Sequence, residues 1–131
     1  LNDTLFVNPT GLDPEENTSE AKINYSSAND LIKLTKELLK KPLIWTILSA
    51  PKFDFYGPEL INTNELLGEI PGIIGGKTGY TDTAGGCMIL VTTTPKEQGF
   101  LVNVILGTDG VNGRFDEMKK LVNWVNSAYR W

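Results

Sequence analysis

The sequence contains no histidine and a single cysteine, Cys87. Without histidine, imidazole-based catalytic triads and the usual Cys/His zinc sites are excluded. One cysteine cannot form an intrachain disulfide. Because Cys87 opens the apolar run Cys87-Met88-Ile89-Leu90-Val91, we expect it to be a small buried thiol. Neither a metal nor a cofactor is expected.

An excess of positive charge and a long hydrophobic run are also missing. The net charge of −4 and the pI near 4.8 argue against nucleic acid as a partner, because phosphate neutralisation requires a basic surface. No apolar run approaches the roughly 20 residues of a membrane-spanning helix. The first residues lack the basic-then-apolar pattern of a signal peptide, which is uninformative in a chain that does not start at an initiator methionine. Leu1 is not an initiator methionine, so we expect a chain cut from something longer.

The composition that remains is that of a globular protein. Over 131 residues, 40% are hydrophobic and 21% charged, which predicts a single domain spanning residues 1–131. Apolar periodicity predicts helices at 27–41, 43–48 (where a strand stays open) and 113–129. Strands are predicted at 52–56, 73–80, 86–94 and 100–108, with a connection and a helical turn over 61–67. The short link 95–99 requires an antiparallel hairpin, so the expected fold is α+β, an antiparallel sheet with packed helices.

The segment Lys77-Thr78-Gly79-Tyr80 is where the sequence is chemically most specific. The ammonium of Lys77 would attract a carboxylate and could relay a proton to a leaving amine. The hydroxyl of Thr78 could donate to the same carboxylate. Gly79 has no Cβ, so a peptide could lie against the strand as an added strand. The amide of Tyr80 is placed to donate to a developing oxyanion.

A phosphate-binding loop is the first alternative, because Gly76-Lys77-Thr78 ends a Gly-x-x-x-x-Gly-Lys-Thr pattern. That pattern requires glycine at position 71, where Pro71 stands. A phosphate loop also opens a helix, whereas the β-branched run after Gly86 favours a strand. The nucleotide interpretation therefore fails.

Several segments, in order along the whole chain, resemble the serine-type D-alanyl-D-alanine carboxypeptidases, the low-molecular-mass penicillin-binding proteins. A Lys-Thr-Gly triplet on a strand is one of the three motifs by which these proteins and the serine β-lactamases hold their substrate. The matching segments are Phe6-Val7-Asn8-Pro9-Thr10-Gly11-Leu12-Asp13, Tyr25-Ser26-Ser27-Ala28-Asn29-Asp30-Leu31, Asn62-Thr63-Asn64, Gly76-Lys77-Thr78-Gly79-Tyr80-Thr81 and the terminal stretch from Arg114 to Trp124.

The resemblance implies the C-terminal part of a β-lactamase/transpeptidase-like domain. The parent would cleave the terminal D-alanine of peptidoglycan stem peptides through an acyl-serine intermediate, outside the cytoplasm, and would be trapped by β-lactams. In the family, Lys77 would be catalytic, and Thr78, Gly79 and Tyr80 would bind substrate. The family's Ser-x-x-Lys and Ser-x-Asn motifs lie upstream of the segment that begins here at Phe6.

Three segments imitate the missing motifs, and we interpret all of them as chance matches. Ser19-Glu20-Ala21-Lys22 has no apolar stripe around it. In Ser49-Ala50-Pro51-Lys52, the proline disfavours one continuous helical turn. Ser27 of Ser27-Ala28-Asn29 is better explained as a helix N-cap, with Asp30 completing a capping-box-like pair.

Two departures from the family's pattern remain. Asn24 stands where the family often has histidine. Some members also place a basic side chain near the stretch that is Asn62-Thr63-Asn64 here, to help bind the substrate carboxylate, and with Arg114 and Arg130 as the only arginines the sequence does not identify that contact. A β-lactamase-related fragment, or a non-catalytic module that binds a peptide or partner at its sheet edge, stays open. Without upstream strands the chain should expose an apolar edge or face, which favours association with the missing N-terminal half or with itself.

Overall fold

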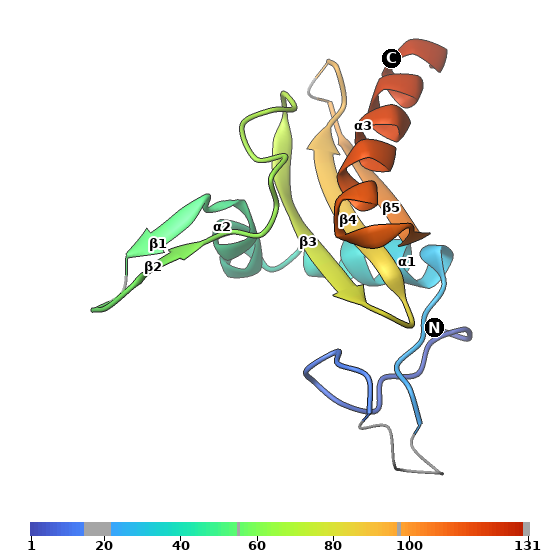
Figure 1. Cartoon of the computed structure of the whole chain (residues 1–131). Helices are drawn as coiled ribbons and strands as arrows, with labels where there is room; N and C mark the ends of the chain where they lie inside the picture. The colour runs from blue at the N-terminus through green and yellow to red at the C-terminus, as the bar shows by residue number, and fades with distance from the viewer. Residues whose placement is uncertain (15–21, 55, 97, 130–131) are drawn as a thin grey trace.

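The computed structural model describes residues 1–14, 22–54, 56–96 and 98–129. Figure 1 shows a central antiparallel sheet with helices on both sides, and a two-stranded hairpin that projects from the body. The elements in chain order are α1 (Ala28–Leu38), α2 (Pro42–Ser49), β1 (Lys52–Asp54), β2 (Glu59–Ile61), β3 (Ile73–Thr81), β4 (Gly85–Thr93), β5 (Phe100–Thr108) and α3 (Gly110–Ala128). The α+β prediction is confirmed.

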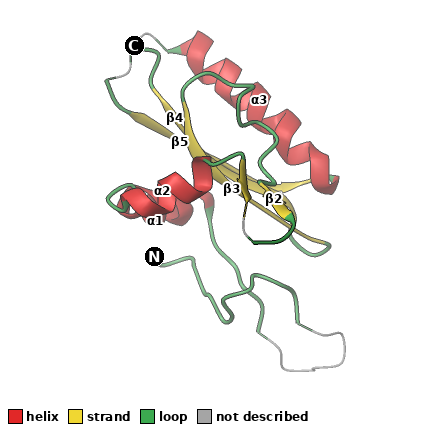
Figure 2. Ribbon diagram, turned by 90° about the vertical axis from the view of Figure 1, so that its left-hand side faces the viewer, coloured by secondary structure: helices red, strands yellow, loops and turns green. Residues whose placement is uncertain are grey.

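The three long strands form one sheet in the order β3-β4-β5, and both pairings are antiparallel. Helix α3 packs on β4 and β5, whereas α1 packs on β5 and α2 on β3. Figure 2 shows α1 and α2 together on the side of the sheet away from α3. Within the described residues, no strand pairs with the outer side of β3 or of β5, so both remain edge strands.

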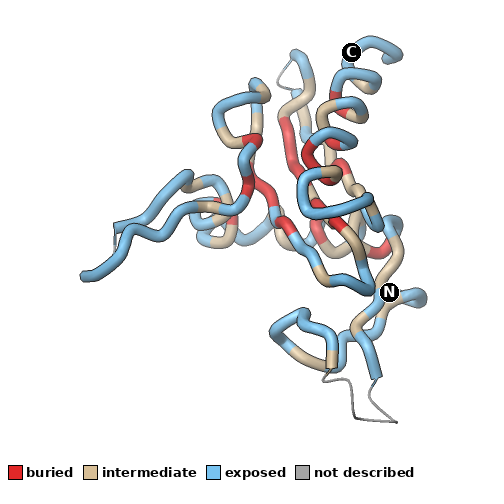
Figure 3. Tube along the Cα trace, in the orientation of Figure 1, coloured by how far each residue is buried: buried red, intermediate tan, exposed pale blue. Residues whose placement is uncertain are grey.

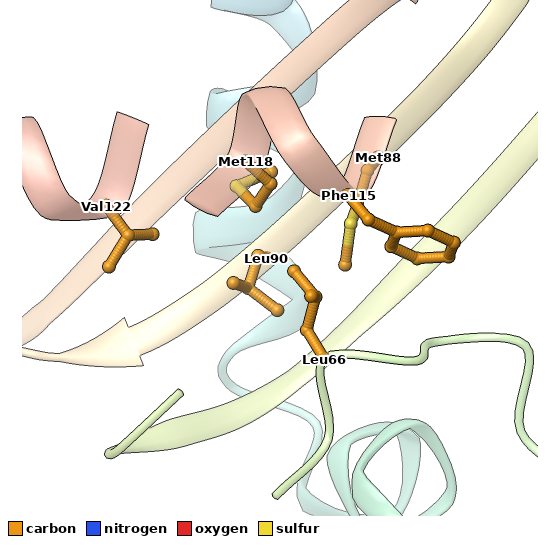
Figure 4. Close-up of a cluster of buried hydrophobic side chains, with 6 residues drawn as sticks. All are labelled: Leu66, Met88, Leu90, Phe115, Met118 and Val122. Atoms are coloured by element: carbon orange, nitrogen blue, oxygen red, sulfur yellow. The ribbon is translucent and has the colours of Figure 1, made fainter. Parts of the chain in front are cut away.

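The hydrophobic core lies between the sheet and α3 (Figure 4). Met88 and Leu90 alternate toward this face of β4, as the period of two in a strand requires. Phe115 and Met118 recur at helical spacing on α3, so the predicted apolar stripe of the last helix is confirmed. The full cluster is Leu66, Met88, Leu90, Phe115, Met118 and Val122.

Local signals at the helix ends also behave as expected. The hydroxyl of Ser27 accepts a hydrogen bond from the Asp30 amide at 3.3 Å, which confirms Ser27 as the N-cap of α1. Pro42 occupies the first turn of α2, where a missing N–H costs nothing, and the ambiguous segment 43–48 is helical. The prediction that the Asp30 side chain completes a capping box with Ser27 is wrong. The Asp30 carboxylate instead accepts from the Asp3 amide at 2.8 Å and from the Thr4 hydroxyl at 3.0 Å.

Two further expectations are corrected. Cys87 is only partly buried, because side chains alternate along β4 and its thiol lies on the face opposite Met88 and the core. The strand predicted at 52–56 ends at Asp54, with residue 55 outside the described chain, and residues Glu59–Ile61 form β2, where only a connection beginning at 61 was expected. Both strands of this hairpin are exposed along their whole length (Figure 3).

Among the described helices, none is both long enough and apolar enough to cross a membrane.

Candidate functional site

Strand β3 places the Lys77–Tyr80 segment on an open edge of the sheet. On its inner side the segment pairs with β4, with Lys77 opposite Ile89 and Thr78 opposite Met88. Because Leu90 and Met88 on β4 belong to the core, the strand that pairs with β3 is itself held by buried side chains. The four residues predicted to act together are therefore brought together along one strand.

An open hollow of about 740 Å³ lies between this edge and the N-terminal segment. Its walls come from parts of the chain that are far apart in sequence: the loop around residues 6–12, the segment after β2, strand β3 and helix α3. The lining residues are Phe6, Asn8, Pro9, Thr10, Gly11, Leu12, Asn24, Thr63, Lys77, Thr78, Gly79, Tyr80 and Arg114.

Lys77 and Thr78 present different groups to the hollow. Lys77 is exposed, and its ammonium donates to the carbonyl oxygen of Thr78. Thr78 is only 6% exposed, and its hydroxyl lies 2.6 Å from the hydroxyl of Thr63. These two residues thus offer an ammonium and a buried hydroxyl, and both groups can donate hydrogen bonds to a carboxylate.

The glycines of β3 serve two purposes. A Cβ on Gly76 would come within 2.7 Å of the Ile89 carbonyl oxygen, so glycine is required there for strand packing. A Cβ on Gly79 would meet only the Cys87 Cβ, at an ordinary 3.8 Å. Packing within the chain therefore does not require glycine at position 79. Its missing side chain leaves the strand backbone open to the hollow.

Arg114 is a site residue that sequence reasoning missed. It lies near the N-terminal end of α3, and its Nη1 donates to the Gly79 carbonyl oxygen at 2.9 Å. Its guanidinium carbon lies 4.8 Å from the centre of the Phe115 ring, and the residue is only 7% exposed. The buried Nε has no hydrogen-bond partner among the described residues. Arg114 stood in the matched terminal stretch, but we interpreted that stretch only as a helix.

The opposite wall of the hollow is held by two asparagines. The Asn24 Oδ1 accepts from the Val7 amide at 2.7 Å, and its Nδ2 donates to the Asn8 Oδ1 at 3.0 Å. The same Asn8 oxygen accepts from the Gly11 amide at 2.8 Å, which closes the loop. Asn24, noted above as a departure from the family's histidine, therefore shapes this wall.

Tyr80 lines the hollow and forms a polar pair with Asp82. Its phenol donates to the Asp82 carboxylate at 3.2 Å. This hydrogen bond, together with the negative charge of Asp82, raises the pKa of Tyr80 above its ordinary value of 10.0. The phenol is therefore protonated at neutral pH, and it contributes a dipole rather than a charge.

Two of the chance motif matches lie within the described residues, and neither lines the hollow. Ser49 is the last residue of α2 and Lys52 begins β1, so the two do not share a helical turn. Ser27 is occupied as the N-cap of α1. Ser19-Glu20-Ala21-Lys22 lies almost wholly outside the described residues. The described chain therefore places no Ser-x-x-Lys pair beside Lys77.

An α+β sheet with a Lys-Thr-Gly edge strand over an open hollow defines a protein of the penicillin-binding and transpeptidase class. The comparison with known proteins agrees: the D-alanyl-D-alanine carboxypeptidase family matches residues 1–110. The chain belongs to this family, which confirms the resemblance drawn from the sequence.

Individual relatives extend the match over nearly the whole chain. The D-alanyl-D-alanine carboxypeptidase DacF of Bacillus subtilis is 33% identical to this chain in the aligned region. That region covers 98% of this chain and 32% of the Bacillus protein. A penicillin-binding protein of Listeria monocytogenes in its cefotaxime-bound form aligns with a TM-score of 0.79 and 32% identity, over 92% of this chain and 47% of that one. The chain thus spans about a third of the length of the curated relatives that it matches.

Proposed function

We propose that this chain forms the Lys-Thr-Gly wall of the substrate cleft in a serine-type D-alanyl-D-alanine carboxypeptidase, as the C-terminal part of its catalytic domain. The observation that carries the proposal is the position of Lys77–Tyr80 on an open strand edge that faces a lined hollow. The family match supports the reaction class. The attacking serine belongs to a segment not found in this chain.

In this proposal, the strand holds the peptide while the serine attacks it. The reaction has two steps, of which the second is hydrolysis of the acyl-serine by water. In the first, the serine oxygen attacks the carbonyl carbon of the penultimate D-alanine, the peptide bond breaks, and the proton that the serine loses leaves on the amine of the terminal D-alanine. Lys77 supplies positive potential and a route for that proton. Thr78 donates to the terminal carboxylate, and the Tyr80 amide donates to the oxyanion.

Gly79 and Arg114 complete the peptide-binding surface. Without a side chain at position 79, the substrate backbone can approach β3 and pair with it as an added strand. Arg114 donates to the Gly79 carbonyl oxygen and adds a second positive charge to the hollow that Lys77 lines. A ligand with a free carboxylate is therefore favoured over a neutral one.

We also propose that the substrate is a peptidoglycan stem peptide ending in D-alanyl-D-alanine, that β-lactams acylate the parent protein, and that the parent acts outside the cytoplasm. Support comes from the family and from the cefotaxime-bound and ampicillin-bound forms of the Listeria relative. The hollow matches these ligands in charge, because its cations are Lys77 and Arg114 and both ligand classes carry a carboxylate.

The decisive experiment is labelling with a fluorescent penicillin. This chain alone should remain unlabelled, and labelling should appear once the N-terminal half of the domain is added. Lys77→Ala should slow that labelling by about 100-fold or more, the scale of losing a transition-state contact. Lys36→Ala, at an exposed position on α1, is the matched control and should leave the rate unchanged. Labelling of the isolated chain would contradict the assignment.

Exposed apolar side chains support association with a second segment. Phe53, Leu60 and Ile61 on the β1–β2 hairpin are 59%, 56% and 73% exposed, and Leu43 on α2 is 72% exposed. Such a patch commonly marks an interface. We expect concentration-dependent sedimentation of the chain alone, relieved by the N-terminal half. A monomer at all concentrations that also fails to bind an apolar dye would contradict this.

A non-catalytic peptide-binding module is the second candidate, and the unpaired outer side of β3 favours it. The labelling experiment separates the two. Binding of a D-alanyl-D-alanine peptide without any penicillin labelling, even with the N-terminal half present, would favour the module.

A further inference from the structure

Thr63 reaches the site from a segment whose backbone is held on both sides by asparagine side chains. The Asn62 Nδ2 donates to the Ala50 carbonyl at 2.9 Å, next to the end of α2. The Asn62 Oδ1 accepts from the Asn64 amide at 2.9 Å, and the Asn64 Oδ1 accepts from the Leu66 amide at 3.1 Å. Leu66 is fully buried in the core. Thr63 is therefore held at a fixed distance from β3.

We propose that Thr63 is a positioning residue for ligand recognition, which sets the direction of the Thr78 hydroxyl through the 2.6 Å contact between their oxygens. The inference rests on the function proposed above and adds to it the residue that prepares Thr78 for a carboxylate. Thr63 and Thr78 both line the hollow, and no other described side chain hydrogen bonds to the Thr78 hydroxyl.

Proton counting explains why the pair matters. Each hydroxyl carries one proton and can also accept. When Thr63 donates to Thr78, the Thr78 proton is free to point at a ligand oxygen. A carboxylate only accepts, so its binding selects the arrangement in which Thr63 donates to Thr78 and Thr78 donates to the ligand. Without Thr63, the Thr78 hydroxyl rotates freely and must be ordered by the ligand.

The charge environment makes the pair selective for an acid over an amide. Lys77 and Arg114 provide positive potential at the same hollow, so an oxygen acceptor is favoured at the Thr78 proton. A terminal amide carries a single acceptor oxygen and two donor hydrogens, and it gains no charge-assisted hydrogen bond there. Thr63 should therefore affect the binding of the acid and leave that of the amide nearly unchanged.

The test compares N-acetyl-D-alanyl-D-alanine with its C-terminal amide, with binding followed by NMR titration of the chain. Thr63→Val keeps the shape and removes the hydroxyl, and it should weaken acid binding about 3- to 10-fold, the scale of one hydrogen bond. Amide binding should stay within about twofold of the unsubstituted chain. Thr63→Ser restores the hydroxyl and should restore acid binding. Because Thr63 is exposed, none of these changes should alter folding.

A double-mutant cycle shows whether Thr63 acts through Thr78. In a Thr78→Val background, adding Thr63→Val should cause no further loss, because the hydroxyl that it orients is gone. An independent loss in that background would overturn the inference, as would a full acid preference retained in Thr63→Val. An unsubstituted chain with no preference for the acid overturns the proposed carboxylate recognition itself, and the role of Thr63 with it.

Discussion

The two walls of the hollow are stabilised by different forces. Strand β3 belongs to a sheet that packs on a core excluded from water, in which Leu66, Leu90 and Met118 are 0% exposed. The opposite wall, formed by residues 6–12 and Asn24, exposes apolar side chains such as Phe6 and is held by hydrogen bonds. One wall is therefore fixed by burial and the other by polar contacts that water can replace. Damage to the first should unfold the chain, and damage to the second should open the hollow.

The largest expected effect breaks the buried wall. Leu90→Ala removes a fully buried side chain between β4 and α3 and should lower the free energy of unfolding by about 2–5 kcal/mol. Urea denaturation measures the change. Leu43→Ala is the matched control, because Leu43 is 72% exposed and the same truncation should stay within about 0.5 kcal/mol. Equal losses of unfolding free energy in both variants would contradict the claim that burial stabilises the β3 wall.

Asp30 gives the polar region a pH dependence. The hydrogen bond from the Asp3 amide, aided by Lys33, lowers the pKa of Asp30 below its ordinary value of 3.8. A lowered carboxyl pKa contributes stability above the ordinary pKa and loses it as the pH falls through the folded value. Asp30→Asn should therefore destabilise the chain at neutral pH and flatten the loss of stability below pH 4.

Thermal unfolding across the acid range measures this prediction. Asn29→Ser, at the neighbouring exposed position of α1, is the control, and it should keep the acid dependence of the unsubstituted chain. An Asp30→Asn variant whose melting temperature falls with acid as steeply as that of the unsubstituted chain would show that this carboxylate does not hold the N-terminal segment.

Asn24→Ala tests the polar wall by itself. The substitution removes the acceptor for the Val7 amide and the donor to Asn8, and it should cost about 1 kcal/mol or less because the contacts are only partly buried. Hydrogen exchange at Val7 should accelerate, while exchange in β4 stays unchanged. Asn2→Ala, at an exposed position nearby, controls for general effects on the segment. Faster exchange throughout the sheet would show that the walls are coupled.

The same contrast explains which parts of the fold the sequence could predict. Strands β3–β5 and helix α3 follow from hydrophobic periodicity, because burial imposes that periodicity on the sequence. Strand β2 was missed because three exposed residues, Glu59–Ile61, leave no alternation to detect. Its existence depends on pairing with β1 in the antiparallel register that joins Asp54 to Glu59, which the three residues of β2 do not reveal by themselves. The partly exposed Cys87 was misjudged because an apolar run does not show which face of a strand is covered.

The site divides in a similar way. The site residues Lys77–Tyr80 could be predicted because they are consecutive in the sequence and form a recognisable motif. Thr63 and Arg114 contact this segment across separations of 15 and 35 residues, and only the folded chain brings them together. The contact between Asn24 and Asn8 spans 16 residues and has no local signal at all. Motifs therefore locate one wall of the hollow, and tertiary structure supplies the rest.

A similarly small effect is expected where the N-terminal segment enters α1. Ser27 caps α1 at the point where the N-terminal segment enters the helix, and Ser27→Ala should cost about 1 kcal/mol by leaving the Asp30 amide without its acceptor. Ser27→Asp keeps an acceptor and should recover most of that loss. Ser127→Ala removes a hydroxyl that only bonds back to the Trp124 carbonyl within α3, and it should change stability by less than about 0.5 kcal/mol. Ser27→Ala could instead leave global stability unchanged and speed hydrogen exchange at Val7. That result would show that the cap stabilises the polar wall and not the core, because α1 would then fray without loosening β5.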